Sequence, residues 1–245
     1  MATVAIGDIH GNLEALDDLL GRITPEVDIQ DTVVFLGDYI DRGPNVKGCI
    51  DRILEFRSTT SAQVVTLLGN HEDWFLRTMR DPTRHSWLLG MEAFETIASY
   101  STTAARDLRA AAEEAGLKLV TERIELPYRV FLELLPTSHV AFFEGLVLYH
   151  QTADTICVHG GLDPCIDSLG EQPREALLWG TDDFVEKYQG KDFVVYGHWG
   201  NAFVNSAGWP EPRIRNRTIG VDTIFHGVLS AIRMPECKVI QSRRH

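Results

Sequence analysis

Apolar residues in the first third of the chain form short runs separated by longer amphipathic stretches. The runs cover residues 3–6, 32–36 and 64–68, and each is followed by a glycine and then a polar residue. Between the first two runs, leucine and isoleucine recur every three or four positions, which predicts a helix over residues 13–23 with Asn12 as its N-cap. Short apolar runs that alternate with helices are typical of parallel β-α-β units, whose strands are buried on both faces.

The middle of the chain has a different pattern. Helix-forming residues dominate from about residue 73 to residue 150, which predicts a helical insertion that caps the edge of the sheet. Strand-like runs resume at residues 155–158 and 193–196 and continue near the end of the chain at residues 217–222, 227–233 and 238–240. The pattern predicts a single α/β domain over residues 1–245 that carries this helical cap.

Composition limits the classes of partner. The chain has 245 residues, 44% of them hydrophobic, and a formal net charge of −12 with a pI near 5.2. Such a surface repels nucleic acid and anionic membranes, so we expect neither as a partner, and an anionic substrate would need a local positive centre such as bound metal ions. The sequence begins without a basic leader and has no apolar run of about 18 residues, so we expect a cytoplasmic enzyme. Its four cysteines lack the spacing of a zinc finger or a disulfide framework.

Five apolar runs end beside residues of the types that bind metals. The blocks are Gly7-Asp8-Ile9-His10-Gly11, Gly37-Asp38-Tyr39-Ile40-Asp41-Arg42-Gly43, Gly69-Asn70-His71-Glu72, His159-Gly160-Gly161 and Gly197-His198. In open α/β sheets, sites form beyond the carboxyl ends of the strands. If the five runs share one sheet, these side chains converge.

Such a set of ligands suits hydrolysis of phosphate esters. Two divalent ions about 3.5–4 Å apart can lower the pKa of a bound water and neutralise the phosphoryl oxygens. Mixed carboxylate, amide and imidazole ligands suit Mn, Fe or Zn better than Mg alone. A carboxylate shared by both ions offsets their repulsion, and a nearby imidazole can protonate the leaving alkoxide.

In this order, the five blocks resemble the calcineurin-like metallophosphoesterases. More narrowly, they resemble the protein serine/threonine phosphatase (PPP) branch, which includes bacterial and phage enzymes and the symmetrical diadenosine tetraphosphate hydrolases. The resemblance extends from about residue 3 to residue 240. It implies a four-layer α+β sandwich in which helices flank central β-sheets, with a helical cap.

The resemblance also implies a role for each matching residue. The implied metal ligands are Asp8 and His10 for the first ion, Asp38 as the bridge, and Asn70, His159 and His198 for the second ion. His71 resembles the general acid, Asp41 the carboxylate that orients it, and Arg42 a phosphate-binding arginine. Glu72 resembles a residue that supports the ligands from behind. The implied cofactor is a pair of divalent ions, Mn²⁺ first, with Fe or Zn as alternatives.

Two positions depart from the protein phosphatase pattern. Leu68 stands where many of these enzymes have an arginine before the Gly-Asn-His-Glu block, and Gly180 follows Trp179 where bacterial enzymes usually place another arginine soon afterwards. The missing cations could be supplied from elsewhere in the chain, and the candidates are Arg77, Arg84 and Arg213. These departures affect the expected substrate more than the expected reaction.

The leading hypothesis is a phosphomonoesterase of the serine/threonine protein phosphatase type, acting on a phosphorylated protein or peptide or on a small phosphoester. The alternative is a symmetrical dinucleoside tetraphosphate hydrolase, which Leu68 favours. A more remote alternative is an inactive metal-binding scaffold, against which the intact His71 and Asp41 argue. We expect the histidines outside the blocks to be hydrogen-bonded structural residues and the tryptophans Trp74, Trp87 and Trp179 to be packing residues.

Overall fold

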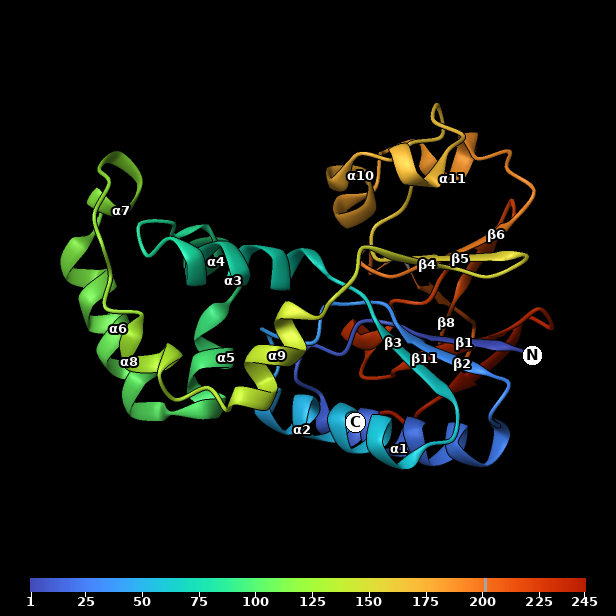
Figure 1. Cartoon of the computed structure of the whole chain (residues 1–245), viewed down its shortest axis with the longest axis horizontal. Coiled ribbons are helices and arrows are strands. Elements are labelled where there is room, and N and C mark those ends of the chain that lie inside the picture. Colours follow the sequence, from blue (N-terminus) through green and yellow to red (C-terminus); the bar gives the residue numbers. More distant parts are fainter. Residues whose placement is uncertain (201) are drawn as a thin grey trace.

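A computed structural model describes residues 1–200 and 202–245, which form two facing five-stranded sheets and one short hairpin (Figure 1). The strand order of the first sheet is β12-β11-β1-β2-β3. Its strands are β1 (Thr3–Ile6), β2 (Thr32–Phe35), β3 (Gln63–Thr66), β11 (Ser230–Met234) and β12 (Lys238–Gln241). Strands β1, β2 and β3 pair in parallel, as the apolar runs predicted, whereas β11 pairs with β1 in the antiparallel sense.

The second sheet has the order β4-β5-β6-β10-β9. Its strands are β4 (Tyr149–Gln151), β5 (Thr155–Val158), β6 (Phe193–Tyr196), β9 (Arg213–Arg215) and β10 (Thr218–Gly220). The five apolar runs therefore lie in two sheets, which corrects the single-sheet arrangement considered from the sequence. A buried apolar layer joins the sheets, with Ala5, Val34, Leu36 and Ile232 from one side and Cys157, Val195, Ile219 and Val221 from the other.

Helices cover the outer faces of both sheets. Alternate side chains of β1 and β2, such as Val4 and Phe35, pack outward against α1 (Leu13–Ile23) and α2 (Val46–Thr59). On the opposite side, β5 and β6 pack against α10 (Arg174–Trp179) and α11 (Phe184–Lys187). The result is the expected four-layer arrangement of helices, two sheets and helices (Figure 1). The short remaining elements are η1 (Thr24–Glu26), η2 (Leu169–Glu171), η3 (Ile224–His226), β7 (Phe203–Val204) and β8 (Pro210–Glu211).

The helix over residues 13–23 has the predicted bounds, but its start differs in detail. Asn12 occupies the N-cap position without a side-chain capping bond. Its side-chain amide instead donates to the carbonyls of Ile9 and His10, at 2.8 Å each. Asn12 therefore shapes the loop that carries His10 rather than capping the helix.

The chain from residue 70 to residue 144 is helical and projects to one side of the sheets (Figure 1). The helices are α3 (Asn70–Arg80), α4 (Ser86–Gly90), α5 (Ala93–Tyr100), α6 (Thr102–Ala115), α7 (Lys118–Thr121), α8 (Arg129–Leu132) and α9 (Thr137–Glu144). Helix α5 begins only at Ala93, directly after Glu92, which adopts a left-handed backbone with φ of 57°. No helix in the described part of the chain is long and apolar enough to cross a membrane.

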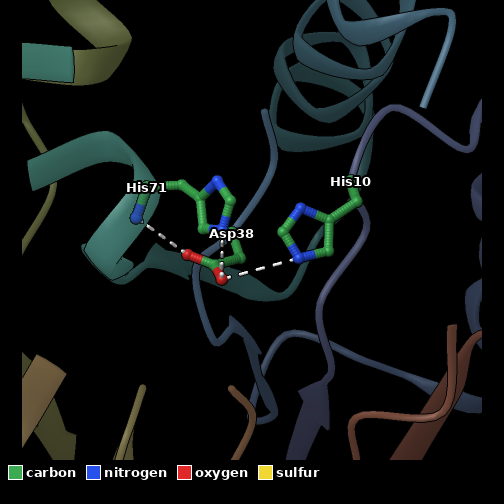
Figure 2. A group of neighbouring side chains, drawn as sticks. All are labelled: His10, Asp38 and His71. Carbon is green, nitrogen blue, oxygen red and sulfur yellow. Dashed lines mark hydrogen bonds and ion pairs between the residues drawn. The ribbon is translucent and has the colours of Figure 1, made fainter. Parts of the chain in front are cut away.

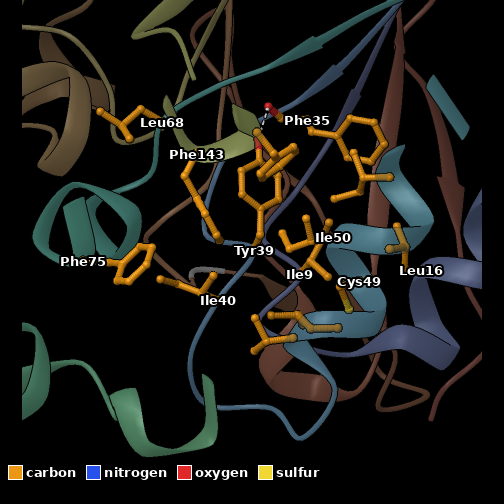
Figure 3. Close-up of a cluster of buried hydrophobic side chains, with 14 of the residues drawn as sticks. Ile9, Leu16, Phe35, Tyr39, Ile40, Cys49, Ile50, Leu68, Phe75 and Phe143 are labelled. Atoms are coloured by element: carbon orange, nitrogen blue, oxygen red, sulfur yellow. Dashed lines mark hydrogen bonds between the residues drawn. The ribbon is translucent and has the colours of Figure 1, made fainter. Parts of the chain in front are cut away.

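Aromatic packing joins these helices to the first sheet. The Tyr39 ring lies 5.2 Å from that of Phe142, and the Phe75 ring lies 5.0 Å from that of Phe143. Figure 3 shows Phe75 and Phe143 close to Tyr39 and Ile40, in the same buried cluster as residues of α1 and α2. Because the apolar core is continuous, we propose that the helical cap and the sheets form one domain.

Candidate metal centre

The candidate site lies where the carboxyl ends of strands from both sheets meet. Each predicted ligand or catalytic residue lies in the loop or at the helix start that follows a strand. Asp8 and His10 follow β1; Asp38, Asp41 and Arg42 follow β2; Asn70 and His71 follow β3; His159 follows β5; and His198 follows β6. Five of these residues have a left-handed backbone, namely His10, Asp38, Asp41, Arg42 and His198. Such strain is common where side chains are held for function.

Two groups of potential ligand atoms converge on Asp38. His10, Asp38 and His71 form one group, and Asp38, His159 and His198 form the other, with the ligand atoms of each group within 4.8 Å of one another. Asp38 Oδ2 lies 3.5 Å from His10 Nε2, and Asp38 Oδ1 lies 3.3 Å from His159 Nε2. Figure 2 shows the Asp38 carboxylate between His10 and His71. Its two oxygens thus face two different groups, as a shared ligand requires.

The ring orientations of the histidines suit metal binding. His10 Nδ1 lies 2.8 Å from the Ile40 carbonyl, and His159 Nδ1 lies 3.0 Å from the Leu36 carbonyl. Because a carbonyl only accepts, both Nδ1 atoms must donate, which leaves Nε2 as the ligand atom. Burial lowers the pKa of His10 to about 3, and burial together with repulsion from His159 lowers that of His198 to about 3. Both rings are therefore neutral, which is the form that binds metals.

Asn70 connects the second group. Its Oδ1 lies 2.8 Å from His159 Nε2 and 2.9 Å from His198 Nδ1. Three potential ligand atoms, from Asn70, His159 and His198, therefore converge within hydrogen-bonding distance. A cation between them would be bound by all three, so the residues present fit a divalent ion.

Two buried carboxyl groups, those of Asp8 and Asp222, lie beside the potential ligands. Asp8 accepts the His198 N–H at 2.9 Å, and burial raises its pKa well above the usual range, with repulsion from Asp222 and Asp38 adding to the effect. Burial also raises the pKa of Asp222 to about 6. The sequence analysis missed Asp222 as a site residue. The available signal was its position at the end of the strand-like run over residues 217–222.

Asp41 holds His71 by a short hydrogen bond. His71 Nδ1 lies 2.7 Å from Asp41 Oδ2, and both side chains are buried. Trp87 Nε1 donates to both Asp41 oxygens, at 3.1 and 3.0 Å, and the Thr96 hydroxyl donates to Oδ1 at 2.5 Å. Burial opposes protonation of His71, but Asp38 and Asp41 outweigh it and raise its pKa. Trp87, which was predicted to be a packing residue, thus also fixes the position of Asp41.

Glu72 supports the loop that carries Asp38. Its carboxylate accepts backbone N–H groups from Asp38 at 2.9 Å, Tyr39 at 2.8 Å and Ile40 at 3.1 Å. A fourth N–H, from Gly69, lies 3.2 Å away. These bonds agree with the expectation from the sequence that Glu72 supports the proposed ligands from behind.

Arg42 is the arginine that contacts the centre in the described residues. Its Nη1 lies 2.8 Å from His10 Nε2, and its guanidinium lies 4.7 Å from the centre of the Phe225 ring. Two of the arginines proposed from the sequence are engaged elsewhere, since Arg77 pairs with Asp73 at 2.8 Å and Arg84 with Asp81 at 3.5 Å.

The third candidate arginine, Arg213, lines a cavity of about 230 Å³ together with Trp199. Trp199 is 40% exposed and its ring lies 5.4 Å from that of His198. Phe225 is 60% exposed and its ring lies 6.4 Å from that of His10. Each group of potential ligands therefore has an exposed aromatic ring beside it.

Comparisons with known proteins agree with this geometry. A family model described as calcineurin-like phosphoesterase matches residues 1–227. The chain is 27% identical over 247 residues to the bis(5'-nucleosyl)-tetraphosphatase PrpE [asymmetrical] of Oceanobacillus iheyensis, covering 94% of this chain and 88% of that protein.

Solved structures share the fold. The cold-active protein-tyrosine phosphatase of a psychrophilic Shewanella sp. matches with a TM-score of 0.56 and 16% identity, covering 99% of this chain and 80% of the other. A metallophosphoesterase from Sphaerobacter thermophilus matches with a TM-score of 0.53 and 15% identity, covering 100% of this chain and 88% of the other.

Proposed function

Because the chain belongs to the calcineurin-like phosphoesterase family, we propose that this metal-dependent phosphoesterase hydrolyses dinucleoside tetraphosphates. The observation that carries the choice of substrate is the pair of exposed rings, Phe225 and Trp199, beside the ligands His10 and His198. The Oceanobacillus relative is named for asymmetrical cleavage of such a substrate. We therefore favour asymmetrical cleavage of a dinucleoside tetraphosphate over both the protein phosphatase activity that led the sequence analysis and its alternative, symmetrical cleavage.

The proposed reaction assigns the metal ligands as predicted. The ions would be held by Asp8, His10, Asp38, Asn70, His159 and His198. When bound, two divalent ions supply a water of lowered pKa and neutralise the phosphoryl oxygens. The identity of the metal is proposed as Mn²⁺, in keeping with a mixed set of oxygen and nitrogen ligands.

The remaining site residues bind phosphate and transfer a proton. Arg42 presents its guanidinium beside His10 and would bind the phosphate to be attacked. His71 Nε2 faces Asp38 at 3.8 Å and would donate its proton to the departing oxygen. Asp41, bonded to Nδ1, would hold the ring in place and stabilise its charged form.

Exposed aromatic rings suit the bases of a dinucleotide. Stacking of a base on an aromatic side chain contributes about 1–3 kcal/mol per base. The Arg42 guanidinium lies 4.7 Å from the centre of the Phe225 ring. Phe225 and Arg42 together would therefore contact both a base and a phosphate.

A second candidate substrate is a phosphoserine or phosphothreonine ester. The observation that favours it is the 2.7 Å bond between His71 and Asp41. An alkoxide leaving group needs a proton from a general acid, whereas a nucleoside phosphate leaves as a stable anion. An intact proton donor is therefore more valuable to an enzyme that cleaves alkyl phosphates.

The deciding experiment compares kcat/KM for diadenosine tetraphosphate and for a phosphoserine peptide in the presence of Mn²⁺. For the dinucleotide, Phe225→Ala and Trp199→Ala should each lower kcat/KM by roughly 5- to 150-fold, the equivalent of one lost stacking contact. Hydrolysis of an aryl phosphate should be far less affected. Phe94→Ala is the matched control, because Arg109 lies 4.0 Å over the Phe94 ring on α5 of the cap. Efficient turnover of the peptide, with none of the dinucleotide, would select the second candidate.

A further inference from the structure

Asp222 is a fully buried carboxylate at the edge of the candidate centre. It is the last residue of the strand-like run over residues 217–222, which includes β10, and β10 pairs in parallel with β6. Because His198 comes after β6, parallel pairing puts Asp222 and His198 at the same end of the second sheet. The predicted ligands do not include Asp222.

One oxygen of Asp222 holds the turn that carries His198. Asp222 Oδ2 accepts the Gly200 N–H at 2.6 Å, and Asp8 accepts the His198 N–H at 2.9 Å. The two carboxylates thus hold the same short turn at two neighbouring points.

The other oxygen is buried without a hydrogen-bond partner. Within residues 1–200 and 202–245, Asp222 Oδ1 is inaccessible to solvent and has no donor. Burying an ionised carboxylate without compensation is costly, so buried charges are normally paired or bind a metal. An unsatisfied oxygen at the edge of a cluster of metal ligands therefore requires an explanation.

We propose that Asp222 Oδ1 is a further oxygen ligand of the divalent ion that Asp8 and His10 would bind. This inference rests on the metal centre of the proposed function. It gives the first ion a third carboxylate besides Asp8 and the shared Asp38, and it explains the unpaired oxygen. Oxygen donors of this kind suit Mn²⁺.

The test is calorimetric titration of metal-stripped protein with Mn²⁺. Asp222→Asn keeps an amide oxygen for the Gly200 N–H but removes the charge. We expect wild-type protein to bind two ions, and the variant to bind one of them about 10–100-fold more weakly. Asp31→Asn is the control, because Asp31 is also a buried carboxylate but pairs with Arg233 at 3.2 Å; its Mn²⁺ affinities should match wild type.

Thermal unfolding of the metal-free proteins separates metal binding from a structural role. Because the variant no longer buries a carboxylate with an unpaired oxygen, the Tm of metal-free Asp222→Asn should be unchanged or higher, while the rise in Tm on adding Mn²⁺ shrinks. Equal Mn²⁺ affinities in variant and wild type, or a lower Tm without metal, would overturn the inference. Asp222→Ser offers the same comparison should the asparagine variant fold poorly. Wild-type protein that binds no Mn²⁺ would overturn the proposed function as well.

Discussion

His71 Nδ1 lies 2.7 Å from Asp41 Oδ2, and Trp87 and Thr96 hold the same carboxylate from the helical cap. The bond fixes the ring so that its other nitrogen, Nε2, faces Asp38. The position of the proposed proton donor therefore depends on the cap as well as on the strand ends.

His71→Asn should lower kcat for an alkyl phosphate by about 10²–10⁴-fold, because general acid catalysis is lost. The loss should be much smaller for an aryl phosphate, whose leaving group departs without a proton. Steady-state kinetics on both esters checks this, together with Mn content by atomic absorption, which should stay at the wild-type level. An equal loss on both esters would contradict the assignment of His71 as the acid.

Gly197→Ala should abolish binding of the first ion. A Cβ at position 197 would collide with Asp8 Oδ1, so the Asp8 carboxylate would have to move. We expect the variant to bind fewer Mn²⁺ ions and to lose hydrolysis. Gly21→Ala is the control, since a Cβ there meets nothing within 4 Å; it should stabilise helix α1 by roughly 0.5–1 kcal/mol. Two bound ions in Gly197→Ala would refute the prediction.

Tyr100→Phe should weaken the attachment of the cap to α2. The Tyr100 hydroxyl lies 2.6 Å from His139 Nδ1, and His139 Nε2 lies 2.9 Å from Asp51 Oδ1. Removing the hydroxyl leaves buried His139 without one partner, at a cost of about 1–3 kcal/mol in the free energy of unfolding. Urea denaturation measures this.

Tyr149→Phe is the matched control for that loss. Tyr149 is 37% exposed on β4, so its variant should stay within about 0.5 kcal/mol of wild type. Catalysis should be unchanged in both variants. A Tyr100→Phe protein as stable as wild type would show that the chain of hydrogen bonds contributes nothing to folding.

Asp31 should stabilise the folded protein at neutral pH and lose this effect in acid. Burial would raise its pKa, but hydrogen bonds from Ala2 N at 2.6 Å and from Arg233 at 3.2 Å outweigh burial and lower it. A carboxyl with a lowered pKa in the folded state stabilises the protein above its unfolded pKa of about 3.9. That stabilisation is lost as the pH falls through the folded value.

Chemical denaturation from pH 7 down to pH 3 checks the contribution of Asp31. The free energy of unfolding of Asp31→Asn should be lower than that of wild type at pH 7. The difference should shrink at the acid end of the range. Parallel pH curves for the two proteins would rule out this contribution.

The sequence determined the strands and most of the centre because both are local patterns. Val4 and Val33 lie in short apolar runs because parallel strands are buried on both faces, and the proposed ligands Asp8 and Asp38 come shortly after those runs. The pattern did not reveal that β5 belongs to a second sheet. A strand's partners depend on contacts between distant segments, and strands of both sheets look alike in sequence.

Only the tertiary structure decided which distant residues support the site. Trp87 and Thr96 bind Asp41 across 46 and 55 positions of the chain, and nothing near either residue marks it as a partner. The same holds for Asp222, whose unpaired oxygen is defined by the burial around it. Local spacing determines which side chains follow the end of the same strand. Hydrogen bonds, burial and charge interactions between separate segments arise only when the chain folds.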